Sequence, residues 1–109
     1  MMAELLRALS STDDAVYRAS EDGARWIASG DLTFANAGPV LAAAQALPLP
    51  TTGLVQCEGI AKVDSAAVAL LLALKRRGAE RGTPLSFVEV PAALRALAAL
   101  YDVEDILTA

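Results

Sequence analysis

Asp64 and Ser65 are the two neighbouring side chains whose types and position suggest a functional role. They stand between a short apolar run and a long stretch without charge, where we predict that a strand gives way to a helix. A serine hydroxyl there can accept a hydrogen bond from a free backbone N–H of the first turn, so we predict Ser65 as the helix N-cap. The pair fits a purely structural cap and also a site at the start of the helix, and both interpretations stay open.

Catalytic chemistry has little support in the rest of the chain. The 109 residues contain no histidine, which removes the most common general base and metal ligand and excludes a Ser–His–Asp set. The single cysteine, Cys57, lies in an apolar run, where a lone thiol is usually a small buried side chain. No glycine-rich phosphate loop occurs, and the acidic groups at 102–105 supply too few oxygen ligands for a cation. We therefore expect no catalytic residue, no cofactor and no metal.

The elements on either side of Asp64 and Ser65 are predicted from apolar runs and helix-forming residues. Residues 54–57 form a β-prone run, and the extended chain continues to Val63. A run of strong helix formers without glycine, proline or charge begins at Ala66. At about 100° per residue, one broad apolar side of this helix is expected to face a sheet. That side comprises Ala67, Val68, Leu71, Leu72 and Leu74.

The opposite arc of the same helix is expected to be exposed, yet small uncharged residues occupy it next to Ser65. Charges appear only two turns later, with Arg76, Arg77 and Glu80. A flat apolar stripe lets another backbone approach closely, although the abundance of alanine throughout the chain explains the pattern equally well. The stripe consists of Ala66, Ala69, Leu70 and Ala73.

The remaining sequence predicts one α/β domain at 15–109. The expected elements are a hairpin of 15–20 and 24–29 around Asp22-Gly23, a helix at 36–47, a strand at 85–90 and a helix from Pro91. They predict a mixed sheet of four to five strands, parallel in its last strands, with helices mainly on one face. Residues 1–14 are expected to be flexible or loosely docked, because two turns of helix at 2–9 do not hold alone in water.

The predicted core collects apolar side chains from these strands and helices. It comprises Leu54, Cys57, Val63, Val68, Leu71, Leu72, Leu85, Phe87, Leu94 and Leu97. Leu32 and Phe34 are expected to anchor the core after the hairpin, and Trp26 to be at least half buried. Val103, Ile106 and Leu107 are expected to pack the end of the chain onto the core.

Charge and hydropathy limit the partners. The formal net charge is −4, which argues against binding to nucleic acid and against adsorption to anionic lipid. The longest uncharged apolar run, 65–74, is far shorter than the roughly 20 residues that span a bilayer. The first residues lack the apolar core of a signal peptide. We expect a soluble protein in a cytoplasmic setting.

The segment KVDSAAVALLLALKRRGAERGTPLSFVEVPAALRALAALYDVEDIL, residues 62–107, resembles a STAS domain, the family named for sulphate transporters and anti-sigma-factor antagonists. The resemblance extends over about 25–107 and is strongest to the short STAS subunits of bacterial Mla lipid-asymmetry transporters. Asp64 and Ser65 fall on the most characteristic positions of the family, and Ser65 on its phosphorylatable hydroxyl. Gln56 departs from the family's usual aspartate, and Ala67 from its usual glycine.

The resemblance implies a non-catalytic protein that binds another protein through the Ser65 end of the helix. On the first hypothesis the partner is the ATPase subunit of an ABC transporter for phospholipids, and the protein works at the inner face of the inner membrane. The implied partner surface comprises Asp64, Ser65, Ala66, Ala69, Leu70, Ala73, Arg76 and Arg77.

The second hypothesis is an anti-sigma-factor antagonist that binds an anti-sigma-factor kinase and is switched by phosphorylation of Ser65. Antagonists of this family generally continue with a further strand and helix, whereas this sequence stops at Ala109. Alanine at Ala67 also stiffens the turn and narrows access to the hydroxyl. Both features favour the transporter subunit, and serine rather than threonine at Ser65 weakly favours the antagonist.

Overall fold

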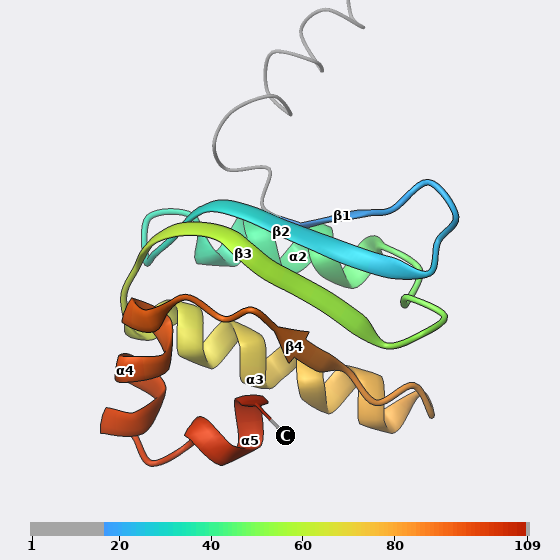
Figure 1. The fold of residues 1–109 in the computed structure, drawn as a ribbon. Helices are drawn as coiled ribbons and strands as arrows, with labels where there is room; N and C mark the ends of the chain where they lie inside the picture. The colour runs from blue at the N-terminus through green and yellow to red at the C-terminus, as the bar shows by residue number, and fades with distance from the viewer. Residues whose placement is uncertain (1–16, 109) are drawn as a thin grey trace, which may run out of the picture.

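The computed structural model describes residues 17–108, which form four strands and four helices (Figure 1). In chain order the elements are β1 (Tyr17–Ala19), β2 (Arg25–Leu32), α2 (Ala37–Ala46), β3 (Leu54–Val63), α3 (Ser65–Glu80), β4 (Ser86–Val88), α4 (Ala92–Leu100) and α5 (Glu104–Thr108). The predicted helical turns at 2–9 lie outside the described residues.

The strands form one mixed sheet in the order β1-β2-β3-β4. The hairpin pairs β1 with β2 antiparallel, so that Tyr17 lies opposite Ala28. Parallel pairing then joins β2 to β3 and β3 to β4, with Val55 between Trp26 and Phe87. The helices α2 and α3 connect these parallel strands and lie side by side (Figure 1). This is the mixed α/β architecture that the sequence predicts.

Burial alternates along the two long strands, because only one face of the sheet carries helices. Trp26 and Ala28 of β2 are buried, and Ile27 between them is only half-buried. Val55 and Cys57 of β3 are likewise fully buried, with Gln56 between them on the other face. The indole N–H of Trp26 donates to the carbonyl of Pro48 at 2.9 Å, which satisfies the one polar atom of this core residue.

The predicted core is confirmed at its centre and wrong at two of its edges. Leu54 is 38% exposed, because it precedes Val55 and therefore points to the helix-free face of the sheet. Phe34 is 76% exposed, because the chain leaves β2 after Leu32 and turns outward. The predicted core residues that are fully or nearly fully buried are Cys57, Val68, Leu71, Leu85, Phe87 and Leu94, whereas Val63, Leu72 and Leu97 are half-buried.

The end of the chain folds back as expected, but through a helix that the sequence does not predict. The short helix α5 buries Leu107 fully and leaves Ile106 50% exposed, so the expectation that Ile106 packs onto the core is wrong. One ion pair joins this end to α4, from Arg95 Nε to a carboxylate oxygen of Glu104 at 3.6 Å.

The second half of α3 lies very close to the loop that follows it. A Cβ built on Gly78 would lie 2.5 Å from the carbonyl oxygen of Thr83 and 2.8 Å from Cγ of Leu85. The packing therefore requires glycine at position 78, because a larger side chain would clash with the loop. Gly38 of α2 is the opposite case, since no atom lies within 4 Å of an added Cβ.

These two glycines give a matched pair of mutations. We expect Gly78→Ala to lower the free energy of unfolding by up to about 2 kcal/mol, because an overpacking cost of about 1–3 kcal/mol outweighs the roughly 1 kcal/mol by which alanine is favoured in a helix. Gly38→Ala should instead raise it by about 0.4–1 kcal/mol. Urea unfolding followed by circular dichroism measures both. A stabilised Gly78→Ala protein would contradict the close approach of α3 and the loop.

Cys57 provides an independent test of the core. The side chain is fully buried, and this burial raises the pKa of its thiol to about 12. At about pH 8 the thiol of the folded protein is therefore protonated and out of contact with solvent, so alkylation by iodoacetamide should require unfolding. The labelling rate should rise in parallel with the unfolded fraction as urea is added. Labelling of the folded protein as fast as that of a free cysteine would show that β3 is exposed.

Candidate functional site

The carboxylate of Asp64 joins the start of α3 to the turn between β2 and α2. Its Oδ1 accepts a hydrogen bond from the backbone N–H of Ala66 at 2.9 Å, and its Oδ2 accepts one from the N–H of Phe34 at 3.0 Å. Asp64 is therefore the N-cap of α3, and Ser65 is the first helical residue. The prediction that Ser65 caps the helix is wrong by one position. Aspartate caps as well as serine does, and here it also binds a second segment.

The turn between β2 and α2 is held in place by further hydrogen bonds. The side chain of Asn36 accepts from the N–H of Thr33 at 3.0 Å and donates to the carbonyl of Asp31 at 2.8 Å. One oxygen of the Asp31 carboxylate accepts from the N–H of Lys62 at 3.1 Å, which ties the turn to the end of β3. The result is a fixed turn that presents the exposed ring of Phe34 near Ser65.

Ser65 and Ala69 form a ridge on the outer side of α3, one turn apart. Ser65 is half-buried, and its hydroxyl makes no side-chain hydrogen bond within the described part of the chain. Ala69 is exposed. We call these two residues the α3 ridge, and the described surface has an apolar hollow on each side of it.

The first hollow lies between α2 and α3. It has a volume of about 420 Å³ and is lined mainly by apolar atoms, with Phe34 at its end near the β2–α2 turn. Ala66 and Leu70 line it as well, although their side chains are almost completely buried within the domain. The lining residues are Phe34, Ala37, Gly38, Leu41, Ser65, Ala66, Ala69 and Leu70.

The second hollow lies between α3 and the turn that joins α4 to α5. It has a volume of about 330 Å³, and the α3 ridge forms one wall. The other wall includes Tyr101, which is 52% exposed, and Val103. The remaining lining residues are Val68 and Leu72 of α3. The two hollows together give an apolar surface on both sides of Ser65.

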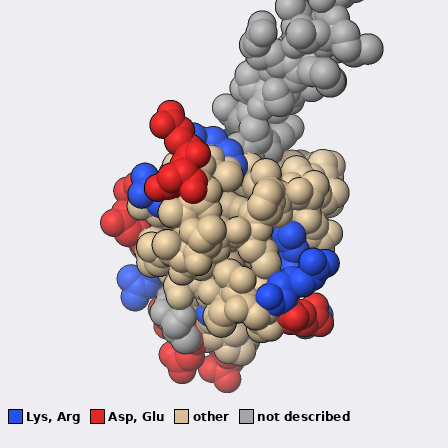
Figure 2. All heavy atoms as spheres, turned by 90° about the vertical axis from the view of Figure 1, so that its right-hand side faces the viewer, with Lys and Arg blue, Asp and Glu red and all other residues tan. Residues whose placement is uncertain are grey.

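A third hollow, of about 440 Å³, lies further along α3 and is polar. It brings three arginines and Glu80 together beside Gln45 of α2. The guanidinium of Arg77 donates at 3.0 Å to the carbonyls of Ala44 and Leu47 at the end of α2. Figure 2 views the molecule from the right-hand side of Figure 1, and charged side chains gather there in separate groups around a broad uncharged surface.

The predicted partner surface is brought together in part. Ser65, Ala66, Ala69 and Leu70 line one hollow, and Ala73, Arg76 and Arg77 line the polar one. The expectation that Ala66 and Leu70 are exposed is wrong, because they are 8% and 3% exposed. Relative to the predicted orientation, α3 is rotated about its own axis by roughly 50°, which is half of the 100° step between successive residues. Packing of α2 against this flank of α3 explains the difference.

Sequence reasoning missed Phe34 and Tyr101 as site residues. Both are large exposed apolar side chains beside the α3 ridge. Phe34 lies in the turn that follows the end of β2. Its position in a turn is the one sequence signal that would have been compatible with an outward side chain. No local pattern marks Tyr101, because its place depends on how α4 packs against α3.

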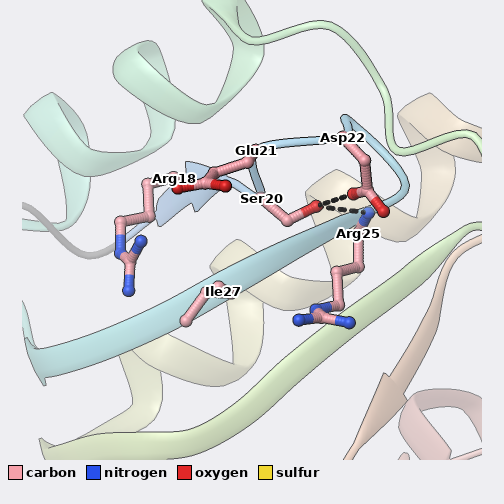
Figure 3. Close-up of a pocket in the computed structure, with 6 residues that line it drawn as sticks. All are labelled: Arg18, Ser20, Glu21, Asp22, Arg25 and Ile27. Atoms are coloured by element: carbon pink, nitrogen blue, oxygen red, sulfur yellow. Dashed lines mark hydrogen bonds between the residues drawn. The ribbon is translucent and has the colours of Figure 1, made fainter.

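A further hollow, of about 330 Å³, lies at the hairpin and contains Arg18, Glu21 and Ile27 (Figure 3). Its hydrogen bonds close the turn itself. The hydroxyl of Ser20 donates to Oδ1 of Asp22 at 2.7 Å, and the N–H of Ala24 donates to the same oxygen at 3.0 Å. The pKa of Asp22 is lowered mainly by the hydrogen bond from Ala24 and secondly by that from Ser20. These groups serve the turn and do not converge on a ligand.

Metal and membrane chemistry find no support in the described residues. Among residues 17–108, no group of three or more histidine, cysteine, aspartate or glutamate side chains is placed to hold a metal ion. Within the same part of the chain, no helix has both the length and the apolar character needed to cross a bilayer.

Residues 16–108 match the family model described as "Mlab, STAS domain". The match covers every described element, including Asp64 and the α3 ridge. No curated protein matches the sequence closely enough to count as a relative.

The double role of Asp64 leads to a graded prediction. Asp64→Ala should lower the free energy of unfolding by about 1–3 kcal/mol, because it removes the helix cap and the bond to Phe34 together. Asp64→Ser keeps a capping oxygen and should recover part of that loss. Ser65→Ala should change the value by less than about 0.5 kcal/mol, because Ser65 is not the cap. Equal losses for Asp64→Ala and Ser65→Ala in urea unfolding would contradict this assignment.

Proposed function

The chain belongs to the STAS domain family, and from this premise we propose that it is a non-catalytic subunit that binds the ATPase of an Mla-type ABC transporter. STAS domains generally mediate protein–protein interactions. In the proposed role the protein stabilises or regulates the ATPase at the cytoplasmic face of the inner membrane. The transporter would carry phospholipids that maintain outer-membrane lipid asymmetry.

The observation that carries this proposal is the α3 ridge between its two apolar hollows. Small side chains on the ridge leave the helix backbone accessible, so that a partner helix can approach closely. Large apolar side chains of the partner can enter the hollows on either side, where Phe34 and Tyr101 offer aromatic contact area. We propose Asp64, Ser65, Ala66, Ala69, Leu70, Ala73, Arg76 and Arg77 as partner-facing or partner-positioning residues.

The proposed roles of these residues differ with their burial. Ala69 and Ser65 meet the partner directly, and Ala66 and Leu70 form the floor of the hollow between α2 and α3. Asp64 acts through position, because both of its oxygens are bound to backbone N–H groups of the domain. The mechanism is recognition by shape and apolar burial, without a covalent step.

A regulatory switch is the second candidate function, and the hydroxyl of Ser65 favours it. The hydroxyl is only half-buried and makes no side-chain hydrogen bond within the described chain, so a kinase could reach it. In this alternative the protein is an anti-sigma-factor antagonist, its partner is an anti-sigma-factor kinase, and phosphorylation of Ser65 ends the contact. Both candidate functions use the same surface, and the identity of the partner separates them.

The test of the proposed function uses the ATPase subunit of the organism's Mla-type transporter as the probe. The wild-type protein should co-purify with it, and Ala69→Arg should abolish the complex by filling the space above the ridge. The matched control is Ala96→Arg, the same change at an exposed position of α4 that lines none of the hollows described above. Both variants should keep the melting temperature of the wild type. Equal binding by the two variants would place the interface elsewhere.

Ser65 supplies a second arm of the test. Ser65→Asp should fold normally and lose the ATPase, because a charge would enter an apolar contact, whereas Ser65→Ala should still bind. Loss of binding by a folded Ser65→Ala protein would mean that the hydroxyl itself is required. A stable complex with an anti-sigma-factor kinase, together with no binding to the ATPase, would establish the alternative.

A further inference from the structure

Arg76, one of the residues that line the polar hollow, lies in line with the α3 ridge. Positions 65, 69 and 76 fall within an arc of roughly 40° on the outer side of the helix, at about 100° per residue. The rise of about 1.5 Å per residue places Arg76 about 16 Å along the axis from Ser65. A partner element that lies along α3 therefore meets the apolar hollows first and Arg76 about three turns later.

The three arginines of this hollow are not equivalent. Arg77 is held by its two hydrogen bonds to the end of α2, where its charge also offsets the negative end of the helix dipole. Arg76 and Arg81 are exposed, and neither forms an ion pair within the described residues. Two guanidinium groups are thus available to an incoming acid, and each can bind a carboxylate with two parallel bonds.

The positive hollow contrasts with the charge of the whole chain. The formal net charge is −4, yet here three arginines face a single glutamate, Glu80. An acidic partner surface would be repelled by the net charge of the chain and attracted by the arginines of this hollow. Such a local reversal of sign fixes the direction in which a partner lies along α3 more than it adds affinity.

We propose that the partner segment is an amphipathic helix with an apolar end over the α3 ridge and one or two carboxylates three or more turns away, over the polar hollow, bound by Arg76 and Arg81. This inference rests on the proposed function, because it describes the contact surface of the same partner. Arg77 is a positioning residue that fixes α2 against α3 and does not bind the partner acid.

The experiment measures the dissociation constant of the ATPase subunit at low and high salt. At about 50 mM NaCl, Arg76→Glu and Arg81→Glu should each weaken binding by about tenfold, and the effect should shrink to about twofold at about 500 mM NaCl, where screening is strong. Arg18→Glu is the matched control. It changes the net charge by the same amount, and its exposed side chain lines the hairpin hollow instead (Figure 3). It should stay within about twofold of wild type.

Arg77→Lys separates the positioning role from direct binding. The lysine keeps the positive charge but cannot make both bonds to α2, so the melting temperature should fall while the dissociation constant changes by less than about twofold. A reversed charge on the partner helix, Glu→Arg or Asp→Arg at the contacting acid, should restore binding to Arg76→Glu.

The outcomes distinguish this inference from the proposed function. If the wild type binds and Ala69→Arg does not, but Arg76→Glu and Arg81→Glu bind like Arg18→Glu at low salt, the acidic segment is wrong and the proposed function stands. If the wild type does not bind the ATPase, both are wrong. A salt-dependent loss confined to Arg76→Glu and Arg81→Glu supports both.

Discussion

The two hydrogen bonds of the Asp64 carboxylate are the constraint on which the candidate site depends. One oxygen accepts a hydrogen bond from a backbone N–H in the first turn of α3, and the other accepts one from the turn that leads into α2. The second bond acts together with that from the N–H of Lys62 to the Asp31 carboxylate, which ties the same turn to the end of β3. The first hollow exists because the spacing between the turn and α3 is fixed, with Phe34 on one side of it and Ser65 on the other. The carboxylate of Asp64 thus has a structural role in both segments.

The order of strands and helices was predictable from sequence because it depends on local signals. The Asp22-Gly23 turn, the apolar strand at 54–57 and the charge-free run after Ser65 each specify an element within a few residues. Side-chain direction was less predictable. Leu54 lies one residue before the buried Val55. Both residues are apolar, so the composition of the strand does not determine which of the two faces the core. The ends of elements, where Phe34 and Ile106 lie, are set by how the chain leaves the core.

The orientation of α3 shows what limits prediction of the site. The predicted orientation is that of a helix that packs only on a sheet, with one side buried and the opposite side exposed. In the structure α3 is also flanked by α2, which covers Leu70 and Ala66, while the opposite flank remains partly open at Leu72. Alanine fits both a buried and an exposed side of a helix, so the rotation of an alanine-rich helix about its axis cannot be predicted from its sequence. Ser65 and Ala69 could be predicted as outward residues, but the hollows beside them depend on three helices and not on one sequence segment.

The position of Ser65 also determines what a charge there could change. A phosphate on its hydroxyl would carry about −1.5 to −2 charges beside the carboxylate of Asp64. At a separation of about 5 Å, each pair of unit charges repels by roughly 1 kcal/mol in water and about 3 kcal/mol at an effective dielectric constant of 20. The positive end of α3 returns about 0.3–1 kcal/mol. Because the hydroxyl faces solvent in part, ions screen both terms. The fold can absorb this difference, whereas an apolar contact formed over the two hollows would have to bury the charge. A charge at Ser65 is therefore expected to disturb an apolar contact over the two hollows more than it disturbs the fold.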